Sequence, residues 1–197
     1  MKKLCTALLA LPLLACMATG PEKALNTLAN ALETKDSALF LAQMDGRQYA
    51  ATEIRTKTAQ SRGLSALDSV GRQLGLGGVE DVLGSIVDME ADVRRTFTRG
   101  VDTGELEAQC RVRTTADCPW VAASLRAASI TEINATAAVA RVTTPAGITS
   151  WLAMNRRGEQ WLITGKAPSE ALARAAATRQ PEAPASKPAA SGSSATL

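Results

Sequence analysis

The sequence predicts a single α+β domain in which several amino-terminal helices pack on an antiparallel sheet. Three observations lead to this fold class. Residues 127–165 contain four strand-like segments separated by short turns, which is the pattern of an antiparallel meander. The segments before residue 100 have apolar residues at helical spacing. A chain of 197 residues that is 46% hydrophobic can bury one ordinary core.

The chain begins with a charged and apolar leader. Two lysines near Met1 precede an apolar run from Cys5 to Ala15, which is too short to span a membrane but suits the core of a signal peptide. The run ends in Leu-Leu-Ala-Cys at positions 13–16, which resembles the lipobox of bacterial lipoproteins. The resemblance implies that Cys16 receives a diacylglyceryl group, that residues 1–15 are removed, and that the new amine is acylated.

Several acyl chains on Cys16 would make a stable membrane anchor. Met17 rather than Asp follows the cysteine, as in lipoproteins sorted to the outer membrane. The resemblance therefore implies an envelope protein that is lipid-anchored and faces the periplasm. The alternative is an ordinary secretory signal peptide in which Cys16 has no role.

A helical segment opens at Pro21, with residues 16–21 as the lipidated terminus and a short linker. Its apolar residues share a helical period: Leu25, Leu28, Leu32, Leu39 and Ala42. The polar stretch Thr34–Ser37 interrupts this period, and Asp36 is a suitable N-cap for a second helix through Met44. We expect two helices that meet at this joint, with one long helix as the alternative.

Asp45 and Gly46 predict a turn, after which the helical period resumes from about Gln48 to Leu74, with a break at Gly63. The Gly-rich stretch Gly75–Gly78 predicts a helix end. It lacks the Lys-Ser/Thr pair and the preceding strand of a phosphate-binding loop, so we expect a plain connection.

Residues Val79 to Phe97 have the strongest helical pattern. Asp88, Glu90 and Asp92 alternate along this helix, but side chains two positions apart on a helix point in different directions. We therefore expect a solvated face rather than a metal or acid–base site.

Residues Glu105 to Arg113 alternate between apolar and polar side chains, which predicts a half-buried strand, although their helix-forming residues leave a helix possible. Asp117 could cap a short helix that runs to Arg126 with Pro119 in its first turn.

With Cys5 removed and Cys16 lipidated, two cysteines remain in an oxidising compartment. We expect a disulfide between Cys110 and Cys118. A redox pair or a nucleophilic thiolate is the alternative, but the spacing is not Cys-x-x-Cys and the sequence contains no histidine to activate a thiol.

The sheet is expected from four segments: Ser129–Ile133, Thr136–Val142, Ile148–Met154 and Gln160–Thr164. In the last two segments both faces carry apolar residues. This pattern predicts that one face takes the helices while the other is partly covered or bends into a pocket.

Two features resemble the nuclear transport factor 2-like (cystatin-like α+β) superfamily. One is the pair of amino-terminal helices with a Lys-Asp joint, and the other is the closing strand Gly158–Thr164. The resemblance covers roughly residues 21–167, and the helical insertion from Gln48 to Phe97 departs from compact members. It implies a curved sheet wrapped on a long helix with a cone-shaped cavity. Enzymatic members place Asp, His or Tyr in that cavity, whereas this sequence has no histidine and a single tyrosine, Tyr49.

An Ala-rich helix is expected from Ser169 to Thr178, which ends the domain that starts at residue 22. Residues 179–197 are rich in Pro, Ala and Ser and have almost no bulky apolar side chain, so we expect a flexible tail.

The composition excludes several functional classes. Removing Lys2 and Lys3 from the 22 basic residues leaves 20 against 19 acidic ones, a net charge of +1, and aromatic residues make up 3%. We therefore expect no nucleic-acid partner. Without histidine, the usual Ser-His and Cys-His nucleophiles and His metal ligands are also excluded.

We expect a non-catalytic envelope lipoprotein, without metal or cofactor, that binds a small apolar ligand or a partner envelope protein. A second hypothesis is an enzyme that uses carboxylates alone, with Asp45, Glu53 or Glu132 as acid or base in the cavity. A third is a purely structural envelope component.

Overall fold

The computed structural model describes residues 20–61 and 79–179, with side chains for residues 20–56 and 88–179. The leader with Cys16, the Gly75–Gly78 stretch and the tail from Gln180 lie outside these residues. The elements are α1 (Pro21–Thr34), α2 (Ser37–Leu41), α3 (Gly46–Ser61), α5 (Val79–Thr103), α6 (Glu105–Val112), α7 (Ala122–Arg126), β1 (Ser129–Asn134), β2 (Ala137–Thr143), β3 (Thr149–Arg157), β4 (Gln160–Ala167) and α8 (Glu170–Ala177).

The four strands form one antiparallel sheet in the order β1-β2-β3-β4, which confirms the predicted meander. Each strand pairs with its neighbour along the chain, because the connections are short turns. Gly147 and Gly158, between β2 and β3 and between β3 and β4, have φ values of +77° and +59°, a conformation in which glycine has no steric cost.

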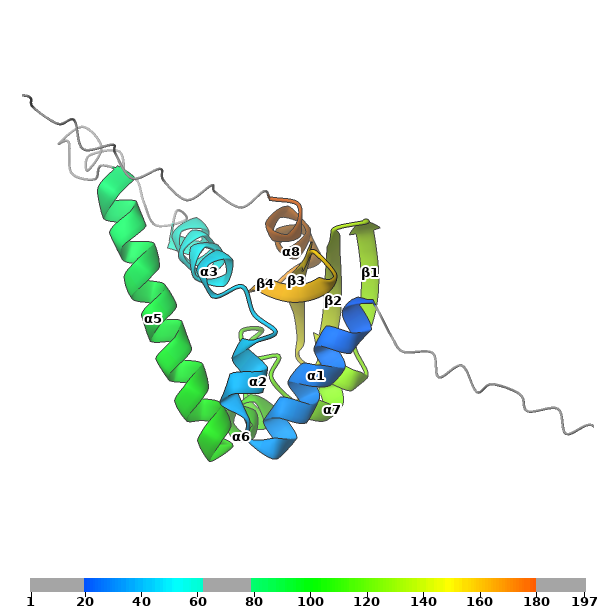
Figure 1. Ribbon diagram of the computed structural model, residues 1–197. Coiled ribbons are helices and arrows are strands. Elements are labelled where there is room, and N and C mark those ends of the chain that lie inside the picture. Colours follow the sequence, from blue (N-terminus) through cyan, green and yellow to red (C-terminus); the bar gives the residue numbers. More distant parts are fainter. Residues whose placement is uncertain (1–19, 62–78, 180–197) are drawn as a thin grey trace, which may run out of the picture.

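The two faces of the sheet are covered differently (Figure 1). One face packs against α1, α2 and α7, and α8 lies on the other face. The buried side chains beneath α8 are small, with Ala173, Ala176 and Ala177 against Ala137, Val139, Ala153 and Ala167, and the partly buried Ile133 and Trp151 pack against this cluster. Of the two expectations for the second face, partial cover or a bend into a pocket, the structure shows cover, by the short Ala-rich helix α8.

The core on the helix-bearing face is filled by an aromatic cluster of Phe40, Tyr49, Phe97 and Trp120. Neighbouring ring centroids are 5.2–6.4 Å apart, and each ring pair is tilted or edge-to-face. All four side chains are buried. Such ring pairs add to the stabilisation that burial of their apolar area provides.

The joint between α1 and α2 is the one predicted. Lys35 has a left-handed backbone with φ +55° and ends α1, and the Asp36 carboxylate accepts a hydrogen bond from the Leu39 amide at the start of α2. The second helix ends at Leu41, short of the expected Met44, which instead forms an isolated parallel bridge with Ile163 of β4.

The prediction of a strand over Glu105–Arg113 was wrong, because this segment forms α6. The alternating apolar residues do not share a buried side: Cys110 is buried, whereas Val112 is 77% exposed. Leu106 and Cys110, four positions apart, face the core, which is helical spacing. The segment is therefore helical, in agreement with the helix-forming residue types that it contains.

The predicted role of Asp117 as a helix cap was also wrong. The helix α7 begins only at Ala122, with Val121 as its N-cap. Asp117 instead accepts a hydrogen bond from the Thr115 hydroxyl and lies 3.8 Å from Arg113. The loop that contains it closes on a disulfide between Cys110 and Cys118, whose Cα atoms are 5.1 Å apart.

Candidate functional site

The start of α3 is held against the edge strand β4. The Asp45 amide donates to the Ile163 carbonyl at 3.0 Å, and the Ile163 amide donates to the Gln43 carbonyl at 2.8 Å. The expected turn at Asp45 is in fact the beginning of α3, where the Asp45 carboxylate accepts a hydrogen bond from the Gln48 amide. Asp45 and Gln48 therefore lie beside the end of β3.

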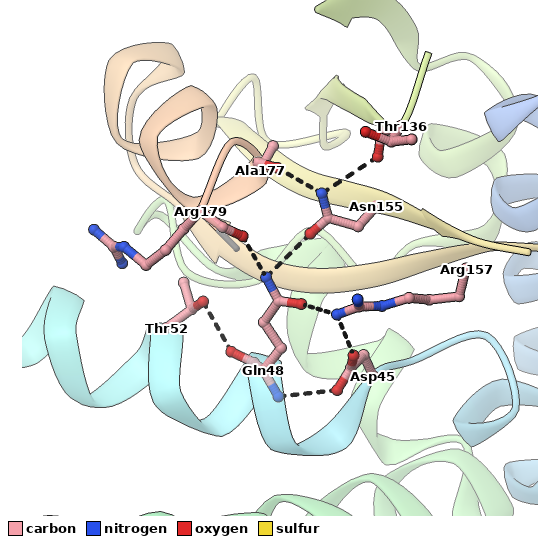
Figure 2. A network of polar contacts seen from close by, with 8 residues as sticks. All are labelled: Asp45, Gln48, Thr52, Thr136, Asn155, Arg157, Ala177 and Arg179. Atoms are coloured by element: carbon pink, nitrogen blue, oxygen red, sulfur yellow. Dashed lines mark hydrogen bonds and ion pairs between the residues drawn. The ribbon is translucent and has the colours of Figure 1, made fainter. Parts of the chain in front are cut away.

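Gln48 is the centre of a polar network, which Figure 2 shows. Arg157 Nη2 donates to Gln48 Oε1 at 2.8 Å and lies 3.2 Å from Asp45 Oδ2, so the guanidinium is held by an amide and a carboxylate. Gln48 Nε2 donates to Asn155 Oδ1 at 3.0 Å. The network fixes the position of the Arg157 side chain at the β3–β4 hairpin.

The same network reaches the last turn of α8 (Figure 2). Asn155 Nδ2 donates to the carbonyls of Ala177 and Thr136, and Gln48 Nε2 donates to the Arg179 carbonyl at 3.4 Å. Carbonyls at a helix end have no partner within the helix, so these side chains supply the missing donors. Asn155 thus connects α3, the sheet and α8.

A groove of about 800 Å³ opens between α1 and the β3–β4 hairpin. Most of its lining is polar: Gly20, Lys23, Ala24, Thr27, Gln43, Arg156, Arg157, Glu159, Gln160 and Trp161. The apolar members Ala24 and Trp161 are buried and present little surface. Arg157 therefore belongs both to the network around Gln48 and to the groove.

Of the three cations that line the groove, Arg157 forms an ion pair with Asp45. Lys23 and Arg156 are exposed, and neither forms an ion pair with any residue that the structure describes. Arg156 uses its Nε to donate to the Gly158 carbonyl at 3.0 Å. Among the lining residues, Glu159 carries a negative charge. The groove can accept an anionic group.

The structure does not bring the three candidate carboxylates together. Asp45 pairs with Arg157, and Glu53 pairs with Lys166 at 3.5 Å. Glu132 is exposed on β1, at the sheet edge opposite to β4. Asp45 and Glu53 each have a cation as partner, and Glu132 faces solvent, so the arrangement is not that of a convergent acid–base pair.

Asp88, Glu90 and Asp92 lie on a solvated face of α5, as predicted. Asp88 and Asp92 are exposed, while Glu90 lies 3.6 Å from Arg94 and Asp92 lies 3.3 Å from Arg95. Within the described part of the chain, no three side chains of the His, Cys, Asp or Glu type are grouped so that they could hold a metal ion.

Tyr49 is a titratable group in the core. Burial raises the pKa of its phenol well above the ordinary value, and the negative charges of Glu53 and Asp117 add to the shift. Its hydroxyl has no hydrogen-bond partner in residues 20–56 and 88–179, and the same holds for the buried hydroxyls of Thr144, Ser150 and Thr164.

The groove residues were not recognised from the sequence. The sequence pattern indicates only a turn at Arg156 to Gly158 and only a helix start around Lys23. Two consecutive arginines in a tight hairpin between apolar strands are the signal that the sequence offered, because both side chains must emerge at one end of the sheet.

No family model matches the chain, and neither a curated protein nor a solved structure matches it. Of the helices in the described residues, none combines the length and the apolar character that crossing a membrane requires.

Proposed function

We propose that this protein is a non-catalytic lipoprotein of the bacterial envelope, anchored through Cys16, whose α+β domain binds a ligand or partner at the groove between α1 and the β3–β4 hairpin. The observation that carries the proposal is the position of this groove. Gly20 forms part of its lining, and Cys16 precedes Gly20 by only four positions. A binding site beside the anchor suits a protein that works at the membrane surface.

The character of the groove supports a polar ligand or partner. Its lining contains three basic side chains and several amide or hydroxyl groups, whereas a site for an apolar molecule is lined mainly by apolar side chains. The aromatic cluster fills the core against the sheet, where a small apolar ligand would otherwise be expected. Of the two occupants expected from the sequence, a small apolar ligand and a partner envelope protein, this lining disfavours the apolar ligand.

The non-catalytic character is supported by the placement of the carboxylates and by the composition. Asp45 and Glu53 are paired with Arg157 and Lys166, and the sequence has no histidine. A general acid or base must lie within hydrogen-bond reach of the substrate atom with which it exchanges a proton. The carboxylates of Asp45 and Glu53 are instead held against cations of the protein.

The relationship to the nuclear transport factor 2-like superfamily is part of the same proposal. It is supported by two amino-terminal helices joined at Lys35 and Asp36 that pack on an antiparallel sheet. An experimental structure of the chain would test it by comparison with members of the superfamily, and a sheet that does not curve around the helices would contradict it.

The anchor is tested by changing Cys16 to Ser. In bacteria fed a fatty-acid probe, the unchanged chain should be labelled and found with membranes, whereas the Cys16→Ser chain should remain unlabelled, because the thiol that accepts the diacylglyceryl group is gone. Labelling is measured on the purified protein. Replacement of Cys5 by Ser, in the leader, is the matched control and should leave the labelling unchanged. A labelled Cys16→Ser chain would contradict the proposal.

A further inference from the structure

We propose that the groove binds the phosphate groups of anionic membrane phospholipids, so that the end of the domain with Lys23 and Arg156 is turned toward the membrane. This inference rests on the proposed anchor at Cys16 and assigns the ligand of the same groove. It is carried by three features of the described residues, which are the position of the groove, its unpaired cations and its polar lining.

The groove is close in sequence to the proposed anchor, and this limits its distance from the bilayer. Gly20 lines the groove and lies four positions after Cys16 in the sequence. Even when fully extended, four residues span at most about 14 Å. With acyl chains on Cys16 inserted in the bilayer, the groove lies within reach of the lipid headgroups.

The cations come from two segments far apart in the sequence. Lys23 is on the first turns of α1, and Arg156 is at the end of β3. Both are exposed, and neither has a carboxylate partner in the described part of the chain. A phosphate between them would receive charge from two sides, as in other phosphate sites built from Arg and Lys.

Arg157 supplies a third donor that is already oriented. Its Nη2 is held by Asp45 and Gln48, and none of its other guanidinium nitrogens donates to a described residue. Because the network fixes the planar group at the groove, less conformational freedom is lost when it binds a phosphate oxygen. Asp45 offsets the charge of Arg157, and Glu159 in the lining offsets one of the two remaining cations, so the groove keeps an excess of positive charge.

The lining argues against a protein as occupant. The central part of a protein interface is usually apolar and rich in aromatic side chains. Here the aromatic residue of the lining, Trp161, is only 6% exposed, so the groove offers no exposed aromatic side chain to a protein partner. An anionic headgroup fits these side chains better.

The test uses the lipidated full chain in vesicles and measures how fast individual side chains are modified. Lysines are acetylated and arginines are modified with a dicarbonyl reagent, and the sites are quantified by mass spectrometry. Vesicles of phosphatidylglycerol with phosphatidylcholine are compared with vesicles of phosphatidylcholine alone. The matched controls are Lys35, Arg99 and Arg141, which are exposed and do not line the groove.

In the anionic vesicles, modification of Lys23 and Arg156 should slow by roughly fivefold, the factor that corresponds to the attraction of one basic residue to an anionic surface. The three controls should keep their rates. Replacing Gln160, which lines the groove without a charge, by Glu should reduce the slowing, because it adds a negative charge to the site.

The other outcomes separate this inference from the proposed function. Equal rates in both kinds of vesicle, with the protein still bound to them, would overturn the phosphate inference and leave the anchor intact. Failure of the protein to associate with either vesicle would contradict the anchor, and with it the inference. The same protection of Lys23 and Arg156 by inorganic phosphate in detergent solution would show that the groove takes free phosphate, which would overturn its assignment to lipid.

Discussion

Tyr49 lies in the aromatic cluster with a hydroxyl that has no hydrogen-bond partner among the described side chains. Burial raises the pKa of this phenol, followed by the charges of Glu53 and Asp117. The folded protein therefore holds Tyr49 in its neutral form at a pH where an exposed tyrosine would ionise. The neutral phenol is preferred because a buried phenolate would lose its hydration.

This shift predicts a loss of stability in alkali. Because the pKa is raised in the folded state, the contribution of Tyr49 is fully present below the ordinary tyrosine pKa of roughly 10 and is lost as the pH rises from there toward the folded-state pKa. Since Tyr49 is the only tyrosine, phenolate absorbance reports on it alone. We expect phenolate to appear together with unfolding, as followed by circular dichroism.

The control is Tyr49→Phe, which keeps the ring and removes the unpartnered hydroxyl. This chain should be at least as stable at neutral pH, because no hydrogen bond to another described residue is lost, and it should lose less stability in alkali. A native protein that shows phenolate near the ordinary pKa would contradict the buried position of Tyr49.

Asp36 and Asp117 show when a local capping signal is enough to predict the start of a helix. Asp36 was predicted as an N-cap and is one, because its carboxylate reaches an amide three positions ahead, a contact that depends on local backbone alone. Asp117 was predicted in the same way and failed. The Cys110–Cys118 disulfide ties the residue after Asp117 back to α6, and the Pro119–Val121 segment is not helical, so α7 begins only at Ala122.

The helix α8 is held by polar contacts at its end as well as by apolar packing. Its packing face consists of alanines, which bury little apolar area, and the Asn155 amide donates to the Ala177 carbonyl of its last turn. Asn155 also accepts from Gln48. The attachment of α8 to the sheet therefore rests on this half-buried amide as well as on the alanine face.

Replacing Asn155 by Ala should lower the free energy of unfolding by about 1–2 kcal/mol, because several hydrogen bonds of a partly buried group are lost. Amide hydrogen exchange should speed up in α8 more than in α1. The control Asn30→Ala removes an exposed amide that accepts from Arg126 on the opposite side of the sheet. If exchange in α8 were unchanged in Asn155→Ala, the network would not hold this helix.

At the scale of the whole molecule, the disulfide joins the end of α6 to the loop that places Trp120 in the core. Cys110 is fully buried and Cys118 is 5% exposed, and Trp120 packs on Phe40 and Phe97. The bond closes a loop of short sequence separation, eight positions. It thereby restricts the unfolded chain and fixes a segment that contributes an aromatic side chain to the core.

Replacing both Cys110 and Cys118 by Ala should lower the free energy of unfolding by about 2–3 kcal/mol, the chain-entropy value for a loop of this length. Urea unfolding measures the change, and the unchanged chain in a thiol reductant should approach the same value. Mass analysis without reductant should find no free thiol at either position. Alkylation of Cys110 or Cys118 in the unreduced protein would contradict the bond.

Sequence alone determined the elements whose signals are local. The meander followed from alternating apolar residues between turn glycines, the α1–α2 joint from its interrupted period and capping residue, and α8 from its Ala-rich segment. The strand prediction for the α6 segment was wrong because its alternating pattern favours a strand while its residue types favour a helix. Packing of Leu106 and Cys110 against the core, four positions apart, decides for the helix.

The tertiary structure alone decided where the polar groups meet. The groove and the network join side chains as distant as Asp45 and Arg157, which are 112 positions apart, and no local pattern specifies such a pairing. It arises because the Gln43–Asp45 segment pairs with β4 and because the β3–β4 hairpin ends beside α1. Cap, turn and periodicity signals act within a few residues along the chain, whereas a binding surface depends on how the finished elements pack.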